Sequence, residues 1–195
     1  MKSLRHTILG MLMLLTVAAA EERSFTSEPF SLQISAPLTW KMMPSTFPTE
    51  KLDLKDRDLE AVIERDKTVP IVSIVKPIKG RIVPAIQVYA VPSDGMTPKA
   101  FLSSLIGTER QAFADCRVVL EPRDTRLNDI EAAASETSYT AIYPGGRSFQ
   151  TISRKWAIPR KTTILVVVLT GTPEDLRDAD AEVKFILRSI RFTKD

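Results

Sequence analysis

Along much of the chain, apolar and polar residues alternate with a period of two, which is the pattern of a half-buried β-strand. In the opening strand, the apolar residues Phe30, Leu32 and Ile34 alternate with polar neighbours. An uninterrupted apolar run at 164–169 predicts the most buried strand of the protein. Strands are predicted at 30–35, 59–65, 71–75, 85–91, 117–121, 130–142, 148–158 and 164–169.

Two segments change to the longer period of an amphipathic helix. The first begins at Thr97-Pro98, where threonine suits the N-cap and proline suits the first helical position. The second begins at Thr172-Pro173, and Asp175 stands where a capping box places its acid. Its apolar stripe continues to Ile190, so one unbroken helix is predicted there.

The order of these elements is several strands, a helix, several strands, a second helix and a short tail. This order predicts an α+β fold, with an antiparallel sheet covered by helices in a single domain. Pro144-Gly145-Gly146, between two predicted strands, indicates a hairpin turn. The charged segment 44–58 is interpreted as a loop, and no linker divides the chain.

The first twenty residues have the three-part pattern of a secretory signal peptide. Lys2 and Arg5 precede an apolar stretch, small alanines end it at Ala20, and polar residues follow. The apolar stretch is shorter than the roughly 20 residues that span a bilayer. We therefore predict a signal peptide at 1–20 and a soluble domain at 21–195, exported to the periplasm or the extracellular space. Whether the peptide is cleaved or kept as an anchor stays open.

Without the predicted signal peptide, the composition of the remaining domain excludes several kinds of catalytic and metal site. The chain has one histidine, His6, so the predicted domain contains none. Ser-His-Asp catalysis, Cys-His catalysis and histidine-ligated metal sites are therefore excluded from that domain. Its one cysteine, Cys116, has no partner in the chain and is interpreted as a buried structural thiol on a strand. Removing the signal peptide lowers the formal net charge from +3 to +1. We predict no cofactor, no metal and no nucleic-acid partner.

Two motifs that could carry chemistry have simpler interpretations. The carboxylates at 53–60 have spacings that a hard cation could use, but interleaved bases and the missing EF-hand glycine favour a solvated loop. Ser73 and Lys76 match the Ser-x-x-Lys motif of penicillin-binding enzymes, which requires a helix. The surrounding β-branched residues predict a strand, where positions three apart face opposite sides. Trp40 is interpreted as a core or lid aromatic.

A stretch at 147–161 holds five basic residues and no acid, with aromatic residues among them. Such a hairpin could contact phosphate, an anionic membrane surface or an acidic protein partner. The alternative is an ordinary solvated strand face with Trp156 in the core. The candidate partner-binding residues are Arg147, Phe149, Arg154, Lys155, Arg160 and Lys161.

The whole predicted domain resembles the PsbP-like and DcrB-like proteins. The resemblance rests on an opening strand that leads into Pro37-Leu38-Thr39-Trp40, a strand followed by a helix at 97–113, and a long hairpin at 130–158. The final helix and its hydrophobic tail, 185–192, complete the pattern. The resemblance implies an α/β/α sandwich and a non-catalytic role as a partner of other proteins. It supplies no catalytic residues to carry over.

These observations predict an exported, non-catalytic binding or accessory protein that docks on a protein partner of the cell envelope. One alternative is a carrier of a small apolar or lipid ligand between sheet and helix, which a cavity of roughly 300 Å³ would favour. A hydrolase that uses carboxylates alone ranks third, because no specific acid pair is visible. The sequence leaves the partner's identity and the oligomeric state open.

Overall fold

A computed structural model describes residues 21–44, 69–78, 81–142 and 147–192. The predicted signal peptide (1–20), the predicted strand at 59–65 and the charged run at 53–60 lie outside these described residues. So does the predicted turn at 144–146, although the two strands that flank it pair as a hairpin up to Ile142 and Ser148.

Within the described ranges, the main sheet has seven strands, and every neighbouring pair is antiparallel. Their order across the sheet is β3-β4-β5-β9-β8-β7-β6. The strands are β3 (Lys41–Pro44), β4 (Val72–Ile78), β5 (Arg81–Pro92), β6 (Arg117–Leu127), β7 (Ile130–Ile142), β8 (Ser148–Pro159) and β9 (Thr163–Gly171). The apolar run at 164–169 lies in β9, at the centre of the sheet, and is buried along most of its length, as predicted.

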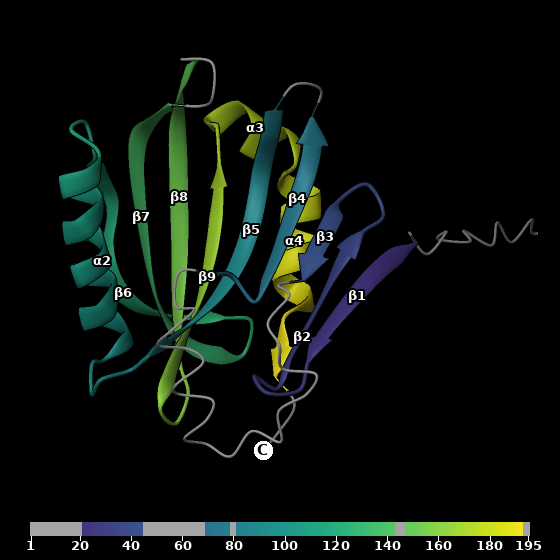
Figure 1. Cartoon of the computed structure of the whole chain (residues 1–195), viewed down its shortest axis with the longest axis horizontal. Helices are drawn as coiled ribbons and strands as arrows, with labels where there is room; N and C mark the ends of the chain where they lie inside the picture. The colour runs from purple at the N-terminus through teal and green to yellow at the C-terminus, as the bar shows by residue number, and fades with distance from the viewer. Residues whose placement is uncertain (1–20, 45–68, 79–80, 143–146, 193–195) are drawn as a thin grey trace, which may run out of the picture.

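A smaller sheet has the order β1-β2-β10 and joins the two ends of the described chain (Figure 1). Its strands are β1 (Glu22–Ser27), β2 (Leu32–Pro37) and β10 (Arg191–Phe192). The predicted alternation in the opening strand is confirmed, because Leu32 and Ile34 are fully buried. β1 escaped prediction since most of its residues are exposed and only Phe25 is large and apolar.

Helices cover both faces of the main sheet and create two separate apolar cores. On one face, α2 (Pro98–Ala112) packs Leu102 against alanine and branched residues of β7, β8 and β9. On the other face, α3 (Pro173–Asp178), α4 (Asp180–Ser189) and β2 pack against the apolar sides of β4, β5 and β9. Figure 1 shows α2 beside β6–β8 and α4 passing behind β4. The predicted α+β architecture is confirmed.

The prediction of one unbroken C-terminal helix is wrong, because the chain bends at Ala179 between α3 and α4. Thr172 caps α3 as predicted, since its Oγ1 accepts a hydrogen bond from the Asp175 backbone N–H at 3.1 Å. In α3, Leu176 lies against Gly171 at the end of β9. In α4, buried residues face β2 and the main sheet instead. The two helices are separated at Ala179, whose φ of −99° and ψ of 9° depart from helical geometry.

Two further interpretations concern single residues. Trp40 is fully buried in the core, as expected. Ser73 and Lys76 lie on β4 as predicted and contact different elements: Ser73 Oγ accepts from Gln87 Nε2 of β5 at 3.3 Å, whereas Lys76 pairs with Glu182 of α4. Cys116 departs from its interpretation, because it lies in the turn before β6 and is only partly buried.

Candidate functional site

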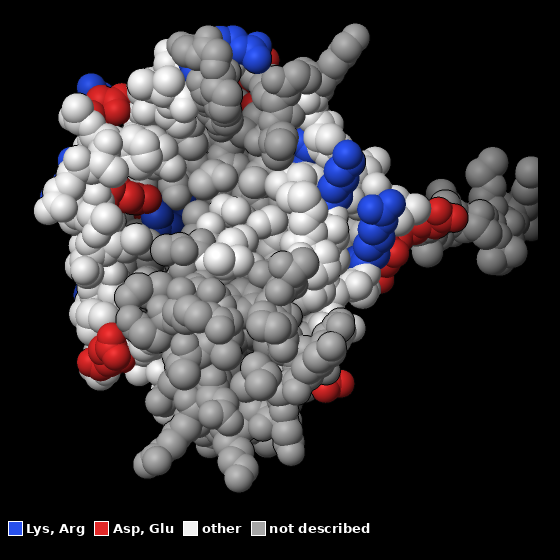
Figure 2. All heavy atoms as spheres, in the orientation of Figure 1, with Lys and Arg blue, Asp and Glu red and all other residues white. Residues whose placement is uncertain are grey.

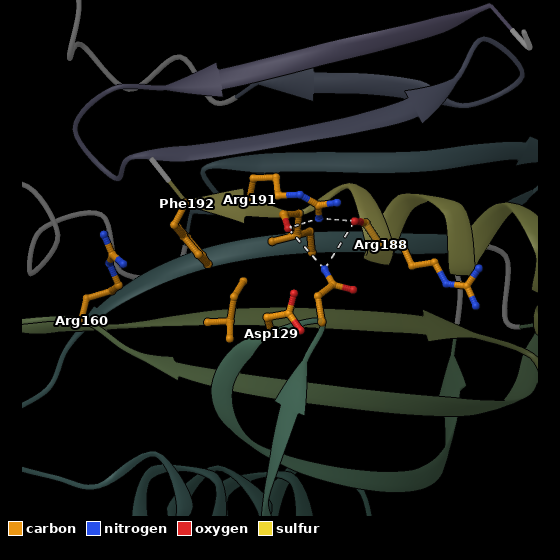
Figure 3. A pocket seen from close by; sticks show the side chains of 8 residues that line it. Asp129, Arg160, Arg188, Arg191 and Phe192 are labelled. Atoms are coloured by element: carbon orange, nitrogen blue, oxygen red, sulfur yellow. Dashed lines mark hydrogen bonds between the residues drawn. The ribbon is translucent and has the colours of Figure 1, made fainter. Parts of the chain in front are cut away.

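An open hollow of about 600 Å³ lies where the end of α4 meets two turns of the main sheet (Figure 3). We call it the arginine hollow. Three arginines and one aspartate give it charge, and isoleucine and phenylalanine side chains give it an apolar lining. Its residues are Asn128, Asp129, Ile130, Arg160, Arg188, Ile190, Arg191 and Phe192.

The turn between β6 and β7 forms one wall of the hollow and is tied to the helix end by Asn128. This residue has a positive φ of 56°, a conformation that asparagine tolerates better than most residues. Its Nδ2 donates to the carbonyl oxygens of Leu187 at 3.0 Å and Ile190 at 3.3 Å. Because helices end with unsatisfied carbonyls, this side chain acts as a C-terminal cap from a distant turn.

Arg191 completes the same capping arrangement from β10. Its Nη1 donates to the carbonyl oxygen of Ile190 at 2.9 Å and to that of Arg188. Arg188 itself lies in the last turn of α4. Cations at this end complement the partial negative charge of the helix C-terminus. The hollow is therefore built on a stabilised helix end, with its backbone acceptors already satisfied.

The turn between β8 and β9 supplies Arg160 to the opposite side. The Arg160 backbone N–H donates to the Thr163 carbonyl at 2.8 Å, which fixes the turn. Its guanidinium carbon lies 4.9 Å from the centroid of the Phe192 ring. This is a cation–π contact, and it orders two side chains that would otherwise have many rotamers. Ile190, fully buried, extends the apolar lining beside them.

The charges of the hollow favour an anion. The lining contains three guanidinium groups and one carboxylate, that of Asp129. In Figure 3, Asp129 lies between Arg160 and Phe192 at one end and Arg188 at the other. Guanidinium groups bind carboxylates and phosphates through paired, charge-assisted hydrogen bonds. The arrangement suits an extended anionic group that also carries an apolar part.

The structure separates the basic stretch that the sequence presents as a cluster. Arg147 and Phe149 lie at the start of β8, whereas Arg160 and Lys161 follow its end. A strand of this length spans about 40 Å at roughly 3.3 Å per residue, so the two groups stand at opposite ends of the sheet. On the face shown in Figure 2, the described basic side chains form separate small groups. Arg154 lies midway and pairs with Glu136 at 2.5 Å.

Lys155 differs most from its predicted surface position, because its side chain is only 2% exposed. Strand alternation turns it to the opposite face from Arg154, under α2. There its Nζ lies 2.7 Å from Glu109 Oε1 and 2.8 Å from Thr137 Oγ1. Burial lowers the pKa of the Lys155 ammonium, and the hydrogen bond that it donates to Glu109 opposes that effect. In this structure, Lys155 is therefore not part of the exposed surface.

Only Arg160 of the six sequence candidates lines the arginine hollow. The sequence interpretation missed Asn128, Arg188 and Arg191. A signal for the two arginines exists, because Arg188 and Arg191 flank the end of the final helix with no acid between them. Tertiary packing brings them to the same hollow as Arg160, and the periodicity of the sequence does not reveal this.

Comparisons with known proteins define the fold. No family model matches the sequence, and no curated protein sequence matches it either. Among solved structures, cyanobacterial PsbP (CyanoP) from Synechocystis sp. PCC 6803 has a TM-score of 0.52 at 10% identity, covering 91% of this chain and 96% of that one. LpqN of Mycobacterium tuberculosis, described as involved in cell envelope biogenesis, has a TM-score of 0.52 at 15% identity, covering 89% and 91%.

These likenesses confirm the predicted PsbP-like fold, in which helices cover both faces of an antiparallel sheet. At such low identities they establish the fold alone. Among the helices of the described ranges, none is long and apolar enough to cross a membrane.

Proposed function

We propose that this chain is an exported, non-catalytic accessory protein that docks on a protein partner of the cell envelope through the arginine hollow. The partner would present an acidic segment with a neighbouring apolar side chain. The observation that carries the proposal is the placement of three guanidinium groups around an apolar lining in one open hollow. Export is supported by the sequence pattern of residues 1–20, and a non-catalytic role by the lack of histidine after His6.

The geometry favours a protein segment over a free apolar ligand. The hollow is open, and part of its lining consists of guanidinium groups, to which a purely apolar molecule offers no hydrogen-bond acceptor. The two apolar cores are filled by packed side chains on either side of the main sheet. The carrier alternative therefore draws less support from the described residues than docking does.

A test can use a fluorescein-labelled peptide that contains four glutamates and one phenylalanine. Fluorescence anisotropy would compare the natural chain with Arg160→Gln/Arg188→Gln. The matched control is Arg147→Gln/Arg177→Gln, which removes the same charge from exposed positions outside the hollow. We expect the first pair to weaken binding at least about tenfold, equal to 1.4 kcal/mol, and the control to change it less than about twofold.

Equal effects of the two pairs would contradict docking at the hollow and would indicate a general charge effect. Binding that does not weaken as salt rises would also contradict it, because exposed charge contacts are screened. Vesicles with anionic lipids provide the competing arm. If they bind through the same arginines while the peptide does not, the site recognises a membrane surface and the protein-docking proposal fails.

In the native envelope, a photo-crosslinking residue can replace Asp129 in one chain and the exposed Lys184 in a control chain. We expect a partner protein to be captured from position 129 only. That capture should disappear when Arg160→Gln/Arg188→Gln is added.

A further inference from the structure

Helix α2 has two halves that rest on different kinds of surface. In the first half, Leu102 and Ile106 are buried against the apolar core. After Ile106, the helix buries no further residue, and Glu109 supplies its inward contact. Below this second half, the sheet face carries the buried polar residues Ser135, Thr137, Ser153 and Lys155. Polar contacts therefore hold the C-terminal half of α2 in place.

Gly107 lies at the junction of the two halves. No atom would meet a Cβ placed there within 4 Å, so packing does not require glycine at this position. Glycine inside a helix costs roughly 0.5–1 kcal/mol relative to alanine because it loses more backbone freedom on folding. The second half of α2 thus follows a weak point in the helix.

Three contacts fix this half and the turn after it, and two of them are made by carboxylates. Glu109 accepts from Lys155 Nζ and from Thr137 Oγ1, the latter at 3.0 Å. Asp115 accepts from the backbone N–H and the hydroxyl of Thr140, at 3.0 and 2.6 Å. The third contact is the stacking of Phe113 on Tyr139, with ring centroids 4.0 Å apart.

We propose that residues 107–115 form an acid-sensitive flap that leaves β7 and β8 when Glu109 loses its charge. Protonation of Glu109 would leave the buried Lys155 ammonium without its close counter-ion, an unfavourable state. Opening hydrates that ammonium and uncovers the hydroxyl groups of Thr137 and Ser153. The flap would thus present a hydrogen-bonding surface only in acid.

The other charged groups near Lys155 do not replace Glu109. Arg110 on α2 has the wrong sign, and Glu136 on β7 is already paired with Arg154. Cys116 lies in the turn before β6, and burial raises the pKa of its thiol, so it stays neutral near pH 7. Hydrogen bonds from Thr140 lower the pKa of Asp115, so this carboxylate keeps its charge to a more acidic pH than an ordinary aspartate and is not the trigger.

Hydrogen exchange on the full chain tests the flap, with rates corrected for their intrinsic dependence on pH. Between about pH 7 and about pH 4, we expect protection at 107–115 to fall at least tenfold more than at 99–106. Glu109→Gln should reproduce this loss at pH 7. Glu131→Gln, an exposed carboxylate on β7, is the matched control and should change nothing. Equal protection of both halves at every pH overturns the proposal.

A second variant keeps the proposal testable if Glu109→Gln disturbs the whole fold. Lys155→Met removes the buried charge, so the pH response of 107–115 between about pH 7 and about pH 4 should be largely lost. Gly107→Ala should slow opening at both pH values, because it strengthens the helix at the junction. A Lys155→Met chain that keeps the full acid response would show that the buried ion pair is not the trigger.

Discussion

Glu182 on α4 gathers three hydrogen-bond donors that come from two other elements. Its Oε2 accepts from Trp40 Nε1 at 3.2 Å and from Lys76 Nζ, and its Oε1 accepts from Thr39 Oγ1 at 3.2 Å. Thr39 and Trp40 lie between β2 and β3, and Lys76 lies on β4. One carboxylate therefore fastens α4 to the main sheet and to the segment that joins the two sheets, and its removal should weaken the whole domain.

The cost of Glu182→Ala can be estimated from these contacts. Trp40 is fully buried, so its indole N–H would lose its partner at a cost of about 1–3 kcal/mol. The carboxylate is 30% exposed, so its ion pair with Lys76 adds at most about 1 kcal/mol. We expect a total loss of about 1–4 kcal/mol, or roughly 2–16 °C in Tm. Glu182→Gln keeps an acceptor and should cost less.

Urea unfolding followed by tryptophan fluorescence measures these differences. Lys184→Ala on the same helix is the control, because its pair with Asp180 is exposed and should contribute only about 0.3–0.5 kcal/mol. The reasoning is refuted if Glu182→Ala loses less than about 1 kcal/mol, or no more than the control.

The same carboxylate gives a pH dependence with a definite sign. Burial by itself raises the pKa of Glu182, but the hydrogen bonds from Lys76, Trp40 and Thr39 outweigh it and hold the pKa below its ordinary value of 4.5. The unfolded chain then binds the proton more readily than the folded one. The stability difference between the natural chain and Glu182→Gln should be complete above about pH 5 and decline as the pH falls through the lowered pKa.

Two further substitutions test the core under α2 and the helix cap beside the arginine hollow. Leu102→Ala should lower the free energy of unfolding in urea by about 2–5 kcal/mol, because it opens a cavity under α2. Leu38 is exposed, so Leu38→Ala should cost less than about 0.5 kcal/mol. Similar costs for the two variants would contradict the described core. Asn128→Ala should lower the free energy of unfolding by about 1–2 kcal/mol, since it loses the helix cap and strains a positive φ. Asn128→Gly also loses the cap but tolerates the positive φ, so its Tm, measured by calorimetry, should be higher than that of Asn128→Ala. If it is not higher, backbone strain does not contribute to the loss.

Elements with strong periodicity were predicted well from the sequence. The hairpin at 130–158, the central strand β9 and the capped start of α2 follow from local patterns and N-cap chemistry. β1 could not be predicted in this way, because it is stabilised by pairing with β2 and has little apolar alternation of its own. The break at Ala179 was missed since the apolar stripe continues through it, and only the backbone dihedral angles of the structure reveal it.

The candidate site was less predictable than the fold, for two physical reasons. Sequence proximity grouped Arg154 with Lys155, although alternation along a strand sends neighbours to opposite faces. That error could have been avoided from the strand pattern itself. The arginine hollow instead joins the turn at 128–130, the turn at Arg160 and the end of α4, which come together only through tertiary packing.

The small sheet has a consequence for the order in which the chain can fold. β2 pairs with β10 through Gln33 and Arg191, so this contact links residues almost at opposite ends of the described chain. Trp40 likewise obtains the acceptor for its indole N–H only from Glu182. Contacts between such distant segments form late, because a long loop must close first. The hairpins of β6 to β9 can pair during synthesis, but the environment of Trp40 is complete only when the last helix has docked.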